Sequence, residues 1–149
     1  MSKVLIVGGG HAGANTAFAL RKDGFDGEIT IISDEGYLPY HRPPLSKDFL
    51  KQNLAIEKLS FKSANFYEEQ NISINLNTQI DSIDLEFNHA TTKDVSFNFD
   101  YLVFATGASP RLLPMENSDA KNLFYLRQIT DVLSIQESIS SAKNIVLIG

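Results

Sequence analysis

A glycine-rich turn near the start of the chain carries residues that are well suited to binding a charged cofactor. Gly8, Gly10 and Gly13 have the spacing G-x-G-x-x-G, directly after a short apolar run and before a segment rich in alanine. Glycines at these positions permit a tight turn, close approach of a pyrophosphate, and close packing of a helix on a strand. The free N–H groups at the start of the helix would face that pyrophosphate. The pattern therefore predicts a dinucleotide-binding turn.

Two neighbouring carboxylates follow at the distance that such a turn requires. Asp34 and Glu35 lie about 20 residues beyond the last glycine, where dinucleotide folds place an acid on the adenosine ribose. We predict that Asp34 is the ribose ligand, with Glu35 as the close alternative. His11 and Ala12 occupy variable positions of the motif, where the backbone matters more than the side chain. The motif does not separate FAD from NAD, and a ligand-free turn with solvated surface acids is the alternative interpretation.

A second candidate site follows a proline-rich segment. Residues 37–44 contain three prolines, whose fixed φ angles predict a rigid, non-helical loop. Ser46 is expected to cap a short helix that has Lys47 in its first turn. A cation at that place opposes the helix dipole, which indicates a functional role for Lys47. An ordinary solvated lysine explains the same residue equally well.

The elements that must position these residues can be read from the apolar patterns. Continuous apolar runs typical of buried parallel strands cover residues 4–7, 28–33 and 101–105. Helical spacing covers residues 11–23, 63–70 and 130–140. Alternating segments at 72–76, 79–85, 89–92 and 95–99 predict a small antiparallel meander. Together they predict an α/β fold, a Rossmann-like parallel sheet with a small antiparallel β-meander.

Composition narrows the classes of function. The chain has 149 residues, 43% hydrophobic and 21% charged, which suits one ordinary globular domain. Its net charge of −5 and the lack of a Lys/Arg cluster argue against a nucleic-acid partner. Cysteine is absent, which excludes disulfides, thiolate metal sites and cysteine nucleophiles within these residues. The absence of cysteine suits a cytoplasmic location, and glycines interrupt the opening apolar run that a signal peptide would need. We expect no membrane association, because the other apolar stretches are too short to span a bilayer, and no metal site.

Several segments together resemble a known family. They are residues 4–13, Leu38-Pro-Tyr-His-Arg-Pro-Pro-Leu-Ser-Lys47, Phe104-Ala-Thr-Gly107 and Tyr125-Leu-Arg127. The chain resembles, through its whole length, the FAD-dependent ferredoxin reductases of the putidaredoxin reductase and biphenyl-dioxygenase ferredoxin reductase type. These form a branch of the pyridine nucleotide-disulfide oxidoreductase superfamily. The resemblance implies a flavoprotein that binds FAD and uses NAD(P)H as co-substrate.

The resemblance also implies roles for individual residues. The glycine motif would bind the ADP half of FAD, Asp34 would hold its ribose, and Arg42 would help to hold the cofactor. Lys47 would lie beside the flavin as the catalytic residue, where a cation favours the anionic reduced ring. The family's lysine pairs with a glutamate of the NAD(P)H domain, and that glutamate has no counterpart in this chain. The remaining cofactor contacts implied are Ile80, Ala105, Thr106, Gly107 and Arg127.

The function implied is electron transfer from NAD(P)H, through FAD, to a small iron–sulfur ferredoxin that serves an oxygenase. The absence of cysteine agrees, because the disulfide-reducing relatives carry a reactive cysteine pair in this region. One alternative is a flavin- or nucleotide-binding module like the apoptosis-inducing factor. Another alternative is a dehydrogenase that binds NAD directly and uses no flavin.

The end of the chain repeats the pattern of its beginning. Residues 144–149 resemble residues 3–8, an apolar run that arrives at a glycine. We expect residues 1–143 to be the N-terminal part of an FAD-binding domain, and residues 144–149 to be the first strand of a truncated NAD(P)H-binding domain. One more strand of the first sheet is the alternative. We also expect a fragment that is inactive alone, retains FAD weakly, and exposes an apolar strand through which copies could associate.

Overall fold

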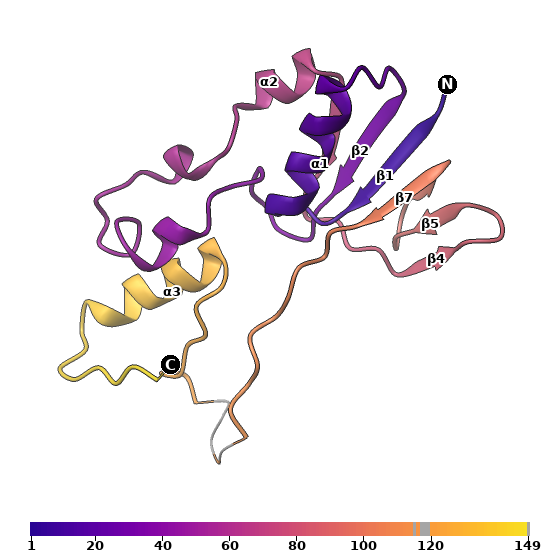
Figure 1. Ribbon diagram of the computed structural model, residues 1–149. Helices are drawn as coiled ribbons and strands as arrows, with labels where there is room; N and C mark the ends of the chain where they lie inside the picture. Colours follow the sequence, from indigo (N-terminus) through magenta and orange to yellow (C-terminus); the bar gives the residue numbers. More distant parts are fainter. Residues whose placement is uncertain (115, 117–119, 149) are drawn as a thin grey trace. The chain divides into compact units, whose positions relative to one another are not determined.

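The computed structural model describes residues 1–114, 116 and 120–148. The chain divides into two compact units, and each combines two segments: Met1–Tyr40 with Ser60–Gly107, and His41–Leu59 with Ala108–Gly149. The first unit holds a parallel sheet, an antiparallel sheet and two α-helices, whereas the second holds 3-10 turns and one α-helix (Figure 1).

The parallel sheet of the first unit has the strand order β3-β2-β1-β7. Its strands are β1 Lys3–Val7, β2 Glu28–Ile32, β3 Ile72–Asn75 and β7 Tyr101–Phe104. Val4 of β1 is level with Ile29 of β2 and with Tyr101 of β7, and both pairings are parallel. Consecutive residues of β1 are buried, which is the property of a strand covered on both faces. The predicted Rossmann-like sheet is confirmed.

Two strands differ from the sequence-based expectation. Residues 72–76 were expected in the meander, but β3 pairs parallel with β2, with Ile72 level with Ile29. The expectation was wrong because alternation, seen here as a buried Ile72 beside an exposed Ser73, indicates a half-buried strand but does not specify the direction of its neighbour. β7 was expected to be buried, yet Tyr101 is 59% and Phe104 is 64% exposed. The reason is that β7 is the last strand of the described sheet and has a neighbour on one side only.

The antiparallel meander is confirmed with three strands. They are β4 Ser82–Asp84, β5 His89–Thr91 and β6 Ser96–Asn98. β5 pairs antiparallel with both neighbours, so that Ala90 is level with Ile83 and Phe97. Ala90 is buried in a core cluster with Leu5 of β1, which fixes the meander against the parallel sheet.

Helix α1, His11–Lys22, covers one face of the parallel sheet, and α2, Ala64–Glu69, lies beside it (Figure 1). Ala14 and Ala17 of α1 are fully buried, so the small side chains allow the helix to lie close to the strands. At the end of α1, the guanidinium of Arg21 donates to four backbone carbonyl groups. They are those of Phe25, Gly27, Gln70 and Asn71, at 2.6–2.8 Å. Arg21 therefore ties α1 to the turns before β2 and β3.

In the second unit, a 3-10 helix forms at Pro43–Ser46, and a second one forms at Ile56–Leu59. The expectation that Ser46 caps a helix with Lys47 in its first turn was wrong. The two prolines begin the turn, as their fixed φ favours at a helix start, and Lys47 lies just beyond its end. The argument from an opposing helix dipole at Lys47 therefore does not hold.

Helix α3, Ile129–Ile139, packs against the 3-10 helix at Pro43–Ser46. The side-chain amide of Gln136 donates to the carbonyl of Phe49 at 2.6 Å. Residues 145–148 form no strand within the described residues, and their side chains are 58–91% exposed. A strand requires a hydrogen-bonded neighbour, and the described parallel sheet does not include this run. Gly149 lies outside the described residues.

Across the described residues, no helix is long and apolar enough to cross a membrane. The same residues contain no group of three or more His, Asp or Glu side chains arranged to hold a metal ion.

Candidate nucleotide-binding site

The glycine turn is packed so closely that side chains could not be accommodated. Gly8 has φ +121°, and a β-carbon on it would lie 2.1 Å from the carbonyl oxygen of Ala105. A β-carbon on Gly13 would lie 2.0 Å from the carbonyl oxygen of Gly8. The turn is held by the N–H of Gly8, which donates to Ile32 of β2 at 2.8 Å. The first and third glycines thus have the tight-turn and helix-packing roles that the motif predicts.

The start of α1 is suited to an anion. Gly10 caps the helix with no side-chain hydrogen bond, and its first turn contains no acidic residue. The first N–H groups of a helix have no partner within the helix and carry its positive dipole end. The ring of His11 packs edge-on against Phe61, with 4.7 Å between ring centroids. This packing agrees with a backbone role for His11 at the motif.

The predicted acidic turn is fixed beside the glycine turn. A β-carbon on Gly9 would lie 2.6 Å from the side chain of Ser33, the residue that follows β2. The carbonyl of Ser33 accepts from the N–H of Thr78 at 2.8 Å, and the carbonyl of Glu35 accepts from the N–H of Asn77 at 3.1 Å. The loop after β3 therefore holds the acidic turn in place against the glycine turn.

The two candidate carboxylates have different environments. Glu35 is partly buried, and its carboxylate accepts a hydrogen bond from the Tyr40 hydroxyl at 2.6 Å. Asp34 is exposed, and its side chain forms no hydrogen bond or ion pair within the described part of the chain. Asp34 is thus the carboxylate that can reach a ligand without losing a protein partner, which favours it as the ribose ligand.

The segment 105–107, which the family resemblance assigns to the cofactor, meets the glycine turn at the carboxyl ends of neighbouring strands. The N–H of Ala105 donates to the carbonyl of Val7 at 2.8 Å. Thr106 and Gly107 follow and are exposed, and Gly107 has φ +71°. Ile80 is partly buried and packs on the core cluster beneath the meander. The first unit therefore brings together the glycine turn, the acidic turn and the segment 105–107.

In the second unit, Arg42 and Arg127 lie together. Nη1 of Arg42 donates to the carbonyl oxygen of Arg127 at 2.8 Å, although 85 residues separate them. Arg127 also borders a cavity of about 250 Å³ that Ser109, Tyr125 and Asp131 line. Lys47 is exposed. The family resemblance assigns both arginines to the cofactor, but the bond between them was not predicted.

Sequence reasoning missed Asp131. Its Oδ2 accepts from the backbone N–H groups of Arg127 at 2.8 Å and Gln128 at 2.7 Å. Gln128 and Asp131 form a capping box at the start of α3, each side chain accepting from the other's backbone N–H. The three-residue spacing of a polar cap and an acid was the available signal.

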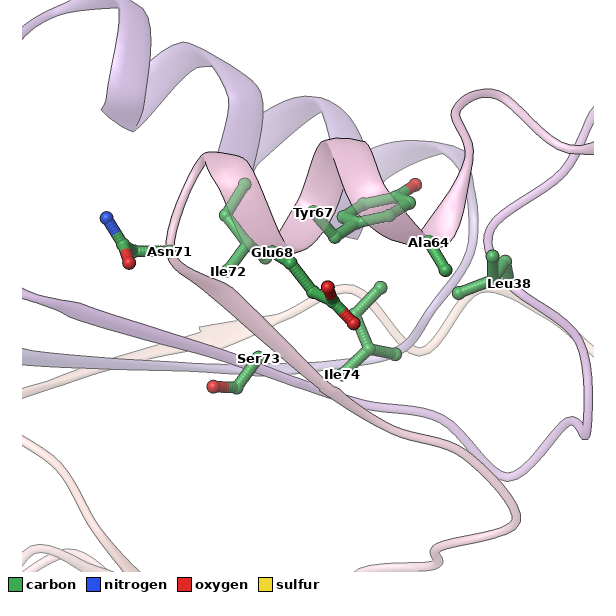
Figure 2. Close-up of a pocket in the computed structure, with 8 residues that line it drawn as sticks. All are labelled: Leu38, Ala64, Tyr67, Glu68, Asn71, Ile72, Ser73 and Ile74. Atoms are coloured by element: carbon green, nitrogen blue, oxygen red, sulfur yellow. The ribbon is translucent and has the colours of Figure 1, made fainter.

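A further cavity of about 500 Å³ lies between α2 and β3, and it contains none of the predicted site residues. Leu38, Ala64, Ile72 and Ile74 give it apolar walls, with Glu68 and Ser73 as polar members (Figure 2). Tyr67 also lines it, and its buried hydroxyl has no hydrogen-bond partner within the described residues. Burial raises the pKa of Tyr67 to about 12, so the phenol stays protonated in neutral solution.

Comparison with known proteins identifies the family. The model of the pyridine nucleotide-disulphide oxidoreductase family matches residues 2–149. The chain is 41% identical to a rubredoxin-NAD(+) reductase of Pseudomonas putida over 147 residues, which is 98% of this chain and 38% of the relative. It is 37% identical to the ferredoxin--NAD(+) reductase component of the p-cumate 2,3-dioxygenase system of Pseudomonas putida, covering 100% of this chain and 37% of the relative.

A solved structure of a related reductase has the same fold. In the crystal structure of the covalent putidaredoxin reductase-putidaredoxin complex, one chain matches with a TM-score of 0.86 and 35% identity. The match covers 93% of this chain and 34% of that one. The chain therefore belongs to the pyridine nucleotide-disulphide oxidoreductase family, whose members bind FAD and use NAD(P)H. It spans little more than a third of the length of these relatives.

Proposed function

We propose that this member of the pyridine nucleotide-disulphide oxidoreductase family is the FAD-binding part of an NAD(P)H:ferredoxin oxidoreductase. The intact protein takes a hydride from NAD(P)H and passes electrons singly to a small iron–sulfur ferredoxin that serves an oxygenase. The observation that carries the proposal is the glycine turn, where β-carbons on Gly8 and Gly13 would clash with backbone oxygens. The relatives named as ferredoxin and rubredoxin reductases support this choice of electron acceptor.

The residues of the first unit fit the nucleotide half of FAD. The glycine turn leaves room for a pyrophosphate next to the uncapped start of α1, where N–H groups would donate to its oxygens. The exposed carboxylate of Asp34 would accept hydrogen bonds from ribose hydroxyl groups. Ile80 and the segment 105–107 complete the proposed set of contacts in this unit.

The second unit supplies cations. Arg42 and Arg127 would hold the cofactor through their guanidinium groups, which have several fixed N–H donors and are always charged. Lys47 would place a positive charge beside the flavin and so favour the anionic reduced ring. Bound flavin supplies the chemistry that accepts a hydride and releases single electrons.

The division of the chain is proposed on the same basis. Residues 1–143 would form the N-terminal part of the FAD-binding domain, and residues 144–149 would begin the NAD(P)H-binding domain. The exposure of the apolar residues 145–148 supports this division, because such a run would be covered by other parts of an intact protein. Association of copies through this run and the cytoplasmic location stay predictions.

The test uses the intact natural protein. The proposal is supported if the purified protein has a flavin absorption spectrum and NADH or NADPH bleaches that spectrum. The reduced protein must then reduce a [2Fe–2S] ferredoxin or a rubredoxin. Bleaching without reduction of any iron–sulfur acceptor would favour the module like the apoptosis-inducing factor. Binding of NAD by the glycine turn of a colourless protein, with no uptake of added FAD, would favour the flavin-free dehydrogenase and refute the proposal.

A further inference from the structure

One peptide group in the second unit is held from both ends by opposite charges. The carbonyl of the peptide between Arg127 and Gln128 accepts from Nη1 of Arg42 at 2.8 Å. The N–H of the same peptide group, which belongs to Gln128, donates to Oδ2 of Asp131 at 2.7 Å. The preceding N–H, of Arg127, donates to the same carboxylate oxygen at 2.8 Å.

The order of charges matches the dipole of the peptide group. Its positive N–H end faces the Asp131 carboxylate and its negative oxygen faces the Arg42 guanidinium. Hydrogen bonds to charged partners are shorter and stronger than neutral ones, and bonds at both ends of a polar group strengthen each other. All four residues are partly buried, so water screens these interactions less than it would on the surface.

Helix α3 provides a rigid base for the carboxylate. Asp131 is the third residue of the helix, and its charge near the helix N-terminus is favoured by the dipole. The side chain of Gln128 completes the capping box by accepting from the backbone N–H of Asp131. Asp131 therefore holds the same peptide group whose carbonyl oxygen accepts from Arg42.

We propose that Asp131 is a positioning residue that fixes Arg42, through the Arg127–Gln128 peptide group, in the orientation in which Arg42 holds the cofactor. The assignment of Arg42 to FAD rests on the proposed function. The link between Asp131 and Arg42 rests on the geometry of the peptide group alone.

The first experiment compares two variants that weaken the same helix cap. Asp131→Asn keeps the shape of the side chain but removes its charge, and we expect the Kd for FAD of the intact protein to rise about tenfold. Gln128→Ala removes the other half of the capping box and leaves the Asp131 carboxylate in place. We expect this control to lower the melting temperature as Asp131→Asn does while the Kd changes less than about twofold. An equal Kd in the two variants would overturn the proposal.

A double-mutant cycle tests whether Asp131 acts through Arg42. Arg42→Lys loses the planar guanidinium that reaches the carbonyl of Arg127. If the proposal holds, adding Asp131→Asn to Arg42→Lys raises the Kd for FAD by far less than Asp131→Asn does in the natural protein. Fully additive effects would show that Asp131 acts independently of Arg42.

A second readout does not depend on FAD. The amide proton of Gln128 is expected at low field in the NMR spectrum of the cofactor-free protein, and Asp131→Asn should move it upfield. Arg42→Lys should also move it upfield, because the two bonds share one peptide group. An unchanged Gln128 amide in Arg42→Lys would refute the link. If the natural protein binds no FAD while these shifts are observed, the proposed function fails and the link between Asp131 and Arg42 stands.

Discussion

Gly8 lies against the carbonyl of Ala105, so closely that a β-carbon on Gly8 would be 2.1 Å from the carbonyl oxygen. The two residues follow the neighbouring strands β1 and β7, whose carboxyl ends meet at the same edge of the sheet. The contact joins the two sequence motifs that resemble FAD-binding segments. The need for glycine at position 8 therefore comes from a residue far along the chain as well as from the local φ of +121°.

Gly8→Ala is expected to abolish FAD binding and to destabilise the protein, because the new methyl group collides with the backbone of Ala105. Gly24→Ala is the matched control. Gly24 also has a positive φ, +86°, but a β-carbon there meets nothing within 4 Å. The control should lose about 1 kcal/mol of stability from backbone strain and keep its affinity for FAD. Calorimetric titration with FAD and thermal unfolding of both variants measure the difference. Wild-type affinity in Gly8→Ala would contradict the assigned site.

Asp34→Asn is expected to weaken FAD binding about 10- to 100-fold, the effect of losing a charge-assisted hydrogen bond of about 1.5–3 kcal/mol. Glu35→Gln should instead lower stability by about 1 kcal/mol, because the carboxylate of Glu35 accepts the bond from Tyr40. Titration of both variants with FAD decides between the two acids. A larger loss of affinity in Glu35→Gln would assign the ribose to Glu35.

Tyr67→Phe is expected to stabilise the protein by about 1 kcal/mol, since it removes a buried hydroxyl that has no partner in the described residues. Chemical unfolding at neutral pH measures this gain. Tyr101→Phe is the control at a residue that is 59% exposed, and it should change stability by less than about 0.5 kcal/mol. A clear loss of stability in Tyr67→Phe would show that the hydroxyl is bonded.

Tyr67 also makes the stability of the protein depend on pH. Burial raises the pKa of Tyr67 from 10.0 to about 12, so between these values the unfolded phenol is ionised while the folded one keeps its proton. The unfolded state then binds fewer protons, and stability falls as pH rises through this window, by about 2–3 kcal/mol in total. Below pH 10 the contribution is fully present. Unfolding curves from pH 9 to 12 should show this loss in the natural protein and its absence in Tyr67→Phe; parallel curves would contradict it.

Lys47→Gln is expected to slow the reduction of bound flavin by NAD(P)H about tenfold, equivalent to about 1.4 kcal/mol in the barrier, because the reduced flavin loses a nearby cation. The Kd for FAD should change little. Lys51→Gln, at another exposed lysine of the same unit, should react at the natural rate. Stopped-flow absorbance of the intact protein measures both. Identical rates in the two variants would remove Lys47 from the proposed mechanism.

The sequence by itself determined the features that depend on neighbours along the chain. The apolar run before Gly8 predicted β1, the alanine-rich segment predicted α1, and their glycine turn formed as the motif required. A helix over residues 63–70 was also predicted, and α2 forms there, with the Ser63 side chain accepting from the N–H of Phe66 at its start. These predictions succeeded because turn geometry, helical spacing and strand burial are set by a few adjacent residues.

Only the tertiary structure decided the features that depend on distant partners. Alternation along residues 72–76 does not say which strand they pair with, and the parallel pairing with β2 decided it. The sequence favoured Asp34 over Glu35 as the ribose ligand by position alone, and only the structure shows that the Glu35 carboxylate accepts a bond from Tyr40. The bond between Arg42 and Arg127 spans 85 residues. Such contacts form when segments that are distant in the sequence pack together, and the local residue pattern of one segment does not identify its partner.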